Sequence, residues 1–228
     1  MKEAIWSRVG PATGILFVIV LHVGFLIHGY PDIRPSDSQL ASWLANVDVN
    51  RFRAGIYVEA VGVVLFIPFL AWLYSRLRQV NRDSSWPAVT MLGAGAIWVA
   101  FTLPIEGAWA GLAEQARKGL DVRVAQTIDS VNQASYDLTG IVLGLILLAA
   151  GIAIVRGAAM SQWVGWAAIV IGVVYIVTLP LGIDATPAGL LGYVWLFAVA
   201  VFYTFRPGRA TAVATATRTV GSGLPATN

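Results

Sequence analysis

The sequence predicts an all-α, polytopic membrane protein built as a bundle of six transmembrane helices, and three observations lead to this class. Of the 228 residues, 57% are hydrophobic and 12% charged, against about 45–50% and about 25% in soluble proteins. The apolar residues form six long runs, each close to the roughly 20 residues that a spanning helix needs. The runs show no strand-like alternation, so helices have to satisfy their backbone hydrogen bonds.

The six expected spans form one domain, residues 1–206. They cover approximately residues 11–30, 54–74, 87–112, 135–155, 163–183 and 188–205. The first run follows Lys2 and Arg8 as in a signal peptide, but it is longer than a signal peptide's apolar region and no A-x-A site follows it, so we expect it to remain as helix one. Residues 207–228 are rich in Ala, Thr and Gly, which predicts a disordered cytoplasmic tail.

Basic residues in the loops predict the orientation, because Lys and Arg are more frequent on the cytoplasmic side. Nine lie on one side, where Arg76, Arg78 and Arg82 share a short turn, and six lie on the other side in two long loops with acidic residues. We therefore expect a protein of the cytoplasmic (inner) membrane with both termini in the cytoplasm. This role in topology also explains the net charge of +3, so no nucleic-acid partner is expected beside the lipid bilayer.

The two outer loops are longer than simple connections require. In the first, Ser36 or Asp37 can cap a short helix with an apolar face at Leu40, Trp43, Leu44 and Val47. The second, residues 114–133, repeats this pattern with Val124, Ile128 and Val131. We expect two interfacial helices that cover the bundle, and a lid over a binding site is the alternative.

Two helical hairpins resemble each other, which predicts a parallel repeat of helices two and three in helices four and five. "YVEAVGVVL" at residues 57–65 corresponds to "YDLTGIVLG" at residues 136–144, and each hairpin ends with "TLP". The Tyr-to-Thr spacing is 45 positions in the first hairpin and 42 in the second. Since proline removes a backbone donor, we expect each TLP segment to bend its helix and open a pocket beside a carboxylate.

Carboxylates near the outer ends of these helices are the candidate functional groups. Glu59 and Glu106 have apolar sequence on both sides and are expected inside the membrane, whereas Asp137 and Asp184 lie nearer its boundary. A buried ionisable group costs a few kcal/mol, so a function and a partner are the default expectation. Helix one offers two candidate partners, His22 and His28, and His28 is at the outer end where the acids also lie. The alternatives are a protonated acid, hydration in a cavity, or hydrogen bonds to Tyr57, Tyr136, Thr102 or Thr178.

The favoured hypothesis is a non-enzymatic protein with an outward-facing polar cavity that binds or passes a proton, a cation or a small amphiphile. The cavity is expected to be lined by Glu59, Glu106, Asp137, His28, Tyr57 and Tyr136. One alternative is an intramembrane enzyme that uses the carboxylates and His28 for acid–base or metal chemistry. Another is a structural subunit of a membrane complex, in which the acids only join helices.

Several chemistries lack a signal in the sequence. There is no cysteine, and no nucleotide-binding, serine-hydrolase or zinc-protease motif is present. His22 and His28 lie about 120° apart around a helix and cannot bind one metal together, so no metal or cofactor is expected. The pairs Gly10/Gly14 and Gly140/Gly144 predict close helix contacts, the second within the chain or in a homodimer.

The run "PSDSQLASWLANVDVNRFRAGIYVEAVGVVLFIPFLAWLYSRLR" resembles uncharacterised bacterial multi-pass membrane proteins of the domain-of-unknown-function type. In these proteins a short extracytoplasmic helix leads through an Asn-Arg-x-x-x-Gly turn into helix two, here Asn50, Arg51 and Gly55. The resemblance implies about six helices and no known activity, so it assigns no catalytic residue.

Overall fold

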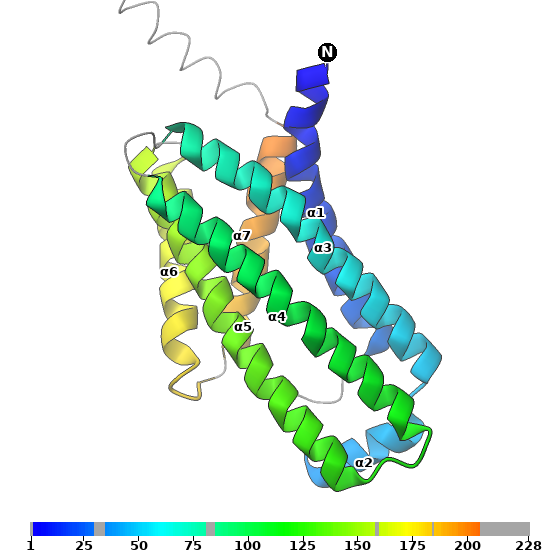
Figure 1. Ribbon diagram of the computed structural model, residues 1–228. Coiled ribbons are helices and arrows are strands. Elements are labelled where there is room, and N and C mark those ends of the chain that lie inside the picture. Colours follow the sequence, from blue (N-terminus) through cyan, green and yellow to red (C-terminus); the bar gives the residue numbers. More distant parts are fainter. Residues whose placement is uncertain (1, 30–34, 81–84, 158–159, 184, 206–228) are drawn as a thin grey trace, which may run out of the picture.

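The computed structural model describes residues 2–29, 35–80, 85–157, 160–183 and 185–205, with the backbone alone for residues 2–7 and 80. Every regular element in these ranges is a helix, which confirms the all-α class (Figure 1). The helices are α1 (Lys2–His28), α2 (Asp37–Asn46), α3 (Val49–Val80), α4 (Trp86–Ala116), α5 (Val122–Gly157), α6 (Gln162–Thr178) and α7 (Thr186–Phe205). The predicted tail, residues 207–228, and Asp184 lie outside the described residues.

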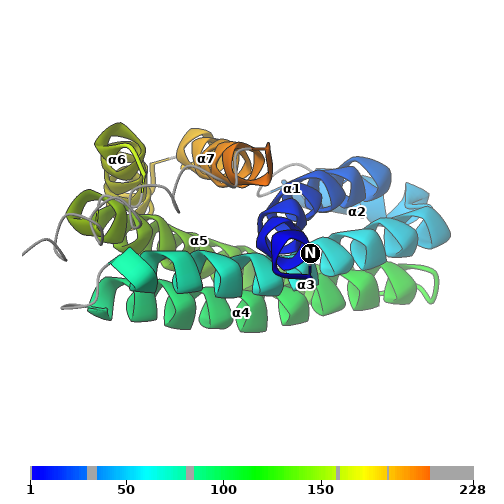
Figure 2. The same ribbon diagram turned by 90° about the horizontal axis from the view of Figure 1, so that it is seen from above.

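Six of the helices form a closed ring. Each packs against two neighbours, in the order α1, α3, α4, α5, α6, α7 and back to α1. Viewed from above, α3, α4 and α5 form one side of the ring, and α6 and α7 lie on the other side with α1 between α7 and α3 (Figure 2). Five helices are long and apolar enough to cross a membrane, and α6 is a shorter apolar helix. The chain is therefore a multi-pass membrane protein.

Three helices of the ring have 31 residues or more and are much longer than a membrane crossing requires. α3, α4 and α5 have 32, 31 and 36 residues, or about 46–54 Å at 1.5 Å per residue, whereas the hydrocarbon core is about 30 Å thick. They extend past α6 and α7 toward α2 (Figure 1). A separate apolar core fills this extension, built from residues such as Leu40, Phe52, Ile105, Trp109 and Ala125.

The structure confirms one predicted loop helix and corrects the other. α2 begins after Ser36, whose side chain forms a capping box with Gln39, and it buries Leu40. The segment with Val124, Ile128 and Val131 is not a separate interfacial helix but the first turns of α5. The physical reason is the absence of Gly and Pro from residues 122–139, so nothing interrupts the helix before it enters the ring.

The two TLP segments have different structures. α4 continues through Pro104 to Ala116, whereas α6 ends at Thr178, before Pro180. The two threonines make the same bond, because the hydroxyls of Thr102 and Thr178 each donate to the carbonyl four residues earlier at 2.8 Å. The hairpins therefore share a local motif and differ in helix length, and the parallel repeat stays a prediction.

Glycines allow the backbones of α1 and α3 to approach each other closely. A Cβ atom built on Gly24 would lie 2.5 Å from the backbone N of Glu59, and one on Gly55 would lie 2.7 Å from the backbone N of His28. Farther along the same interface, a Cβ on Gly62 would lie 2.6 Å from the backbone N of Leu21. Any side chain at these positions would push the two helices apart.

The predicted glycine pairs also lie at contacts within the chain. Gly10 and Gly14 face Trp72 and Phe69 of α3, and Gly140 and Gly144 face α6. At Gly144, an added Cβ would lie 3.0 Å from the carbonyl oxygen of Gly172. The second pair is therefore used between α5 and α6 of one chain.

Replacing Gly24 by Ala should lower the melting temperature of the detergent-solubilised protein. Overpacking of this kind costs about 1–3 kcal/mol, and about 1 kcal/mol corresponds to roughly 2–4 °C for a chain of this size. Gly107→Ala is the matched control, because Gly107 is also helical and an added Cβ there has nothing within 4 Å. Equal melting temperatures for the two variants would show that α1 and α3 tolerate the extra methyl group.

Candidate functional site

His28 is the last residue of α1, and two features hold it there. Gly29 adopts a positive φ of 60°, a conformation that glycine accepts readily and that ends the helix. The Arg51 Nε donates a 2.7 Å hydrogen bond to the carbonyl of Ile27, which satisfies one of the unpaired carbonyls of the helix end. Arg51 and Gly55 belong to the Asn-Arg-x-x-x-Gly motif, and both of them contact the end of α1 that carries His28.

The imidazole of His28 is hydrogen-bonded to the carboxyl group of Glu59. Their Nε2 and Oε2 atoms are 2.7 Å apart, and both residues are buried. One proton lies between these atoms, donated either by the imidazole N–H to a carboxylate or by a carboxyl O–H to the imidazole. Of the partners that the sequence offered for Glu59, the structure selects the histidine.

Glu106 belongs to the same cluster. It is 5% exposed, against 8% for Glu59, and it interacts electrostatically with His28. Glu59 is ten residues from the start of α3 and Glu106 ten residues from the end of α4, so each lies about 15 Å from that end of its helix. Because α3 and α4 are antiparallel neighbours, the two carboxyl groups are at the same depth. His28, Glu59 and Glu106 are called the acid–histidine cluster below.

A surface cavity of about 260 Å³ lies beside the acid–histidine cluster. Its wall is formed by His28, Trp43, Asn46, Val47, Asp48 and Arg51. Asp48 also fixes the start of α3, since its Oδ1 accepts hydrogen bonds from the backbone N–H groups of Asn50 and Arg51. The imidazole of His28 is fully buried against Glu59, so the backbone of His28 is the part that borders the cavity.

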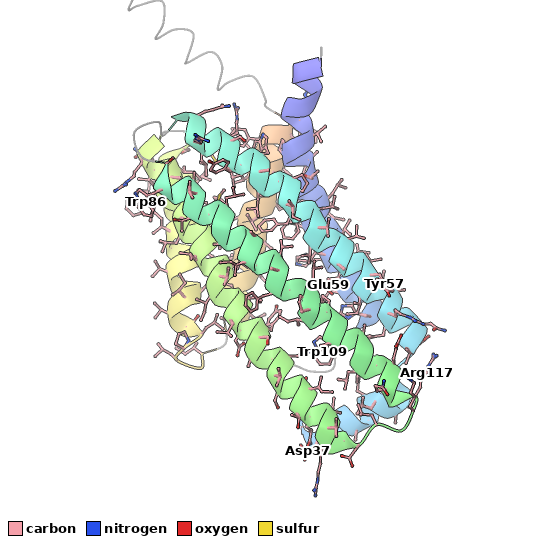
Figure 3. The ribbon with its side chains drawn as sticks, in the orientation of Figure 1. Asp37, Tyr57, Glu59, Trp86, Trp109 and Arg117 are labelled. Atoms are coloured by element: carbon pink, nitrogen blue, oxygen red, sulfur yellow. The ribbon has the colours of Figure 1, made fainter. Side chains whose placement is uncertain are left out.

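The other predicted lining residues lie elsewhere. Tyr57 is 66% exposed, and it is two residues from Glu59, so it points to a different side of α3 (both are labelled in Figure 3). Tyr136 is 56% exposed, yet it interacts electrostatically with Glu59, Glu106 and Asp137. Of the six predicted residues, His28 is the one in the wall of this cavity, and ligand binding by all six stays a prediction.

Comparison with protein families identifies the group to which this architecture belongs. The model of the family described as domain of unknown function (DUF4386) matches residues 12–206. The chain belongs to the DUF4386 family. Searches of curated proteins and of solved structures found no match. The match includes all the residues of the acid–histidine cluster and all of the cavity wall, so the site lies within the DUF4386 domain.

The sequence did not predict a second polar group in this DUF4386 domain, formed by Tyr175, Tyr193 and His22. Tyr193 lies near Tyr175 and both glutamates, and its ring lies edge to face with His22 at 5.2 Å. Tyr175 is buried between Gly140 and Gly189. The hydroxyl group of a buried tyrosine usually has a polar partner. A tyrosine in the middle of an apolar span was therefore the sequence signal that could have predicted this second polar group.

The described part of the chain was also searched for groups of side chains that could bind a metal ion. Among the residues that the structure describes, no three His, Cys, Asp or Glu side chains are grouped so that they could hold a metal ion. The chemistry that the acid–histidine cluster supports directly is the sharing of a proton between the imidazole and the carboxyl groups.

A double-mutant cycle should show that His28 and Glu59 act together. We expect His28→Ala and Glu59→Ala to give a coupling free energy of about 1 kcal/mol or more, because a hydrogen bond to a charged group contributes about 1.5–3 kcal/mol. The measurement is equilibrium unfolding in detergent.

The matched control for this cycle is His22→Ala combined with Glu59→Ala. The His22 Nδ1 donates to the Val18 carbonyl of its own helix at 2.7 Å, so these two changes should add to within about 0.5 kcal/mol. The same coupling in both cycles would contradict a specific His28–Glu59 bond.

Proposed function

We propose that this protein binds a proton, or in its place a small cation, from outside the cell at the acid–histidine cluster. The observation that carries the proposal is the 2.7 Å bond between the buried side chains of His28 and Glu59, next to a surface cavity that the His28 backbone borders. We further propose that the α2 end faces outward and that both termini are in the cytoplasm of a cell whose cytoplasmic (inner) membrane holds the protein.

The energetic argument starts from the burial of the acids. A carboxyl group within a membrane costs a few kcal/mol, and groups retained at that cost are functional by default. Two carboxyl groups and one imidazole near a cavity can hold a variable number of protons, because a proton that reaches the cluster is shared between His28 and Glu59. The 2.7 Å separation accommodates a proton between these two atoms.

The apolar interior of the ring favours a protein that binds a proton over one that passes a proton across the membrane. Between the cluster and the opposite end of the bundle lies an apolar core that includes the buried aromatic residues Phe17, Phe66, Phe69 and Trp98. Phe17 and Phe66 have their ring centroids 4.5 Å apart, and Trp98 lies 5.2 Å from Phe66. A proton that reaches the cluster is therefore expected to leave by the same end.

The cavity size favours a small ligand. A volume of about 260 Å³ is below the roughly 300–1,000 Å³ of sites for drug-sized molecules. Its wall carries one acidic and one basic side chain, Asp48 and Arg51, in addition to His28. These features support a proton or a small ion in preference to an amphiphile.

The test is the melting temperature of the purified protein between pH 5 and 8, and at constant pH with added sodium, potassium, magnesium or calcium. Since a ligand that binds the folded state stabilises it, we expect the melting temperature of the wild type to change by about 2–4 °C between pH 5 and 8. Glu59→Gln and Glu106→Gln should lose most of this shift.

The matched control is Glu114→Gln, an exposed carboxylate at the same end that pairs with Arg53. It should keep the wild-type shift. If the wild type and both buried variants respond equally to pH and to cations, the acids are structural hydrogen-bonding groups and the proposed function is wrong.

The orientation is testable because the chain has no cysteine, so a single introduced thiol reacts without background. Asn46→Cys, in the cavity wall, should react with a membrane-impermeant maleimide added to intact cells. Gln79→Cys, exposed near the end of α3, should react only after the cells are permeabilised. The reverse labelling pattern would overturn the proposed orientation.

A further inference from the structure

The described charged side chains at the end of the bundle opposite α2 are all positive. Four arginines lie there, Arg8 on α1, Arg76 and Arg78 on α3, and Arg156 on α5. Among the side chains described at this end there is no carboxylate, whereas the α2 end has Asp37, Asp48, Glu114 and Asp121 among its basic residues. The α2 end can thus neutralise its own charges, and the arginine end lacks described anions that could do so.

Three of these guanidinium groups lie on aromatic rings. Arg156 is 5.8 Å from the ring centroid of Trp86, Arg76 is 5.7 Å from that of Tyr203, and Arg78 is 5.9 Å from that of Tyr74. A guanidinium group that lies on a ring keeps its N–H edge available for a second partner. The partner that fits this edge is a bidentate oxyanion, a carboxylate or a phosphate.

The pair of Arg156 and Trp86 lies next to an apolar strip on α6. Arg156 is near the end of α5, Trp86 begins α4 (labelled in Figure 3), and α6 starts a few residues after Arg156. Trp86 and Trp163 are 52% and 82% exposed. One face of α6 continues this exposed surface at three- and four-residue spacing, with Trp163, Trp166, Val170, Val173 and Val177.

We propose that Arg156, Trp86 and Trp163 form a binding site for the headgroup of an anionic phospholipid, whose acyl chains lie along the exposed face of α6. The Arg156 guanidinium pairs with the headgroup phosphate, and the two indole rings lie at headgroup level, where tryptophan is favoured. The α6 strip supplies the apolar contact. An anionic phospholipid fits both the arginine and the apolar face of α6. Its phosphate lies at headgroup level, and its acyl chains extend from there into the membrane leaflet.

The experiment measures the melting temperature of the purified full chain in detergent with added phosphatidylglycerol or phosphatidylcholine of the same chain length. The wild type should be stabilised several degrees more by phosphatidylglycerol. Arg156→Gln should lose at least half of this difference, and Arg156→Lys, which keeps the charge, should retain more of it. Comparing the two lipids within each variant removes the effect of the substitution itself on stability.

Two controls separate this site from general effects of charge. Arg53→Gln removes an exposed arginine at the α2 end and should keep the full difference between the lipids. Inorganic phosphate at the concentration of the lipid should give no comparable stabilisation, and an equal effect of phosphate would overturn a lipid site in favour of an anion site.

The proposal is also overturned if Arg156→Gln responds to the two lipids as the wild type does, or if phosphatidylcholine stabilises the wild type as much as phosphatidylglycerol. Native mass spectrometry gives an independent readout that does not depend on melting. Phosphatidylglycerol should remain bound to the wild type and to Arg53→Gln, and its bound fraction should fall several-fold in Arg156→Gln.

Discussion

A histidine and a glutamate from two helices can share one proton in a membrane only if the backbones of those helices come close together. Gly24 and Gly55 provide this approach between α1 and α3, and an added Cβ at either position would meet the backbone of the residue that carries the partner side chain. The bond from Arg51 to Ile27 holds the end of α1 over the start of α3. The cluster and the cavity beside it follow from this contact.

The length of α3, α4 and α5 adds a second constraint. Because these helices continue past the others, the α2 end has its own apolar core, and α2 has a surface to pack against. Trp43 of α2 contacts Phe52 and Trp109, with ring centroids 5.2 and 6.0 Å apart, and Phe52 in turn contacts His28 at 5.2 Å. The acid–histidine cluster is therefore covered by an aromatic layer that belongs to the extension and not to the membrane-spanning ring.

Hydropathy predicted the apolar helices, the residue type of Ser36 predicted the cap of α2, and depth along the helices predicted the grouping of Glu59, Glu106 and His28. Rotation about the helix axis was not predictable: Tyr57 shares the depth of Glu59 but lies about 200° away around α3. The cavity wall was missed because Asn46 and Asp48 line it only once α2 has folded back over the ring. The start of α5 was not predicted, because an amphipathic pattern predicts a helix without fixing the residue at which it begins.

The depth of Glu59 has an electrical consequence. A charge that moves from the α2 end to the acid–histidine cluster crosses part of the membrane's electric field, and full crossing changes its energy by about 2.3 kcal/mol per 100 mV. The aromatic core around Phe66 and Trp98 fills the remaining depth with mainly apolar side chains. If the cluster binds a proton from the α2 end as proposed, its protonation depends on the membrane potential as well as on the pH at that end.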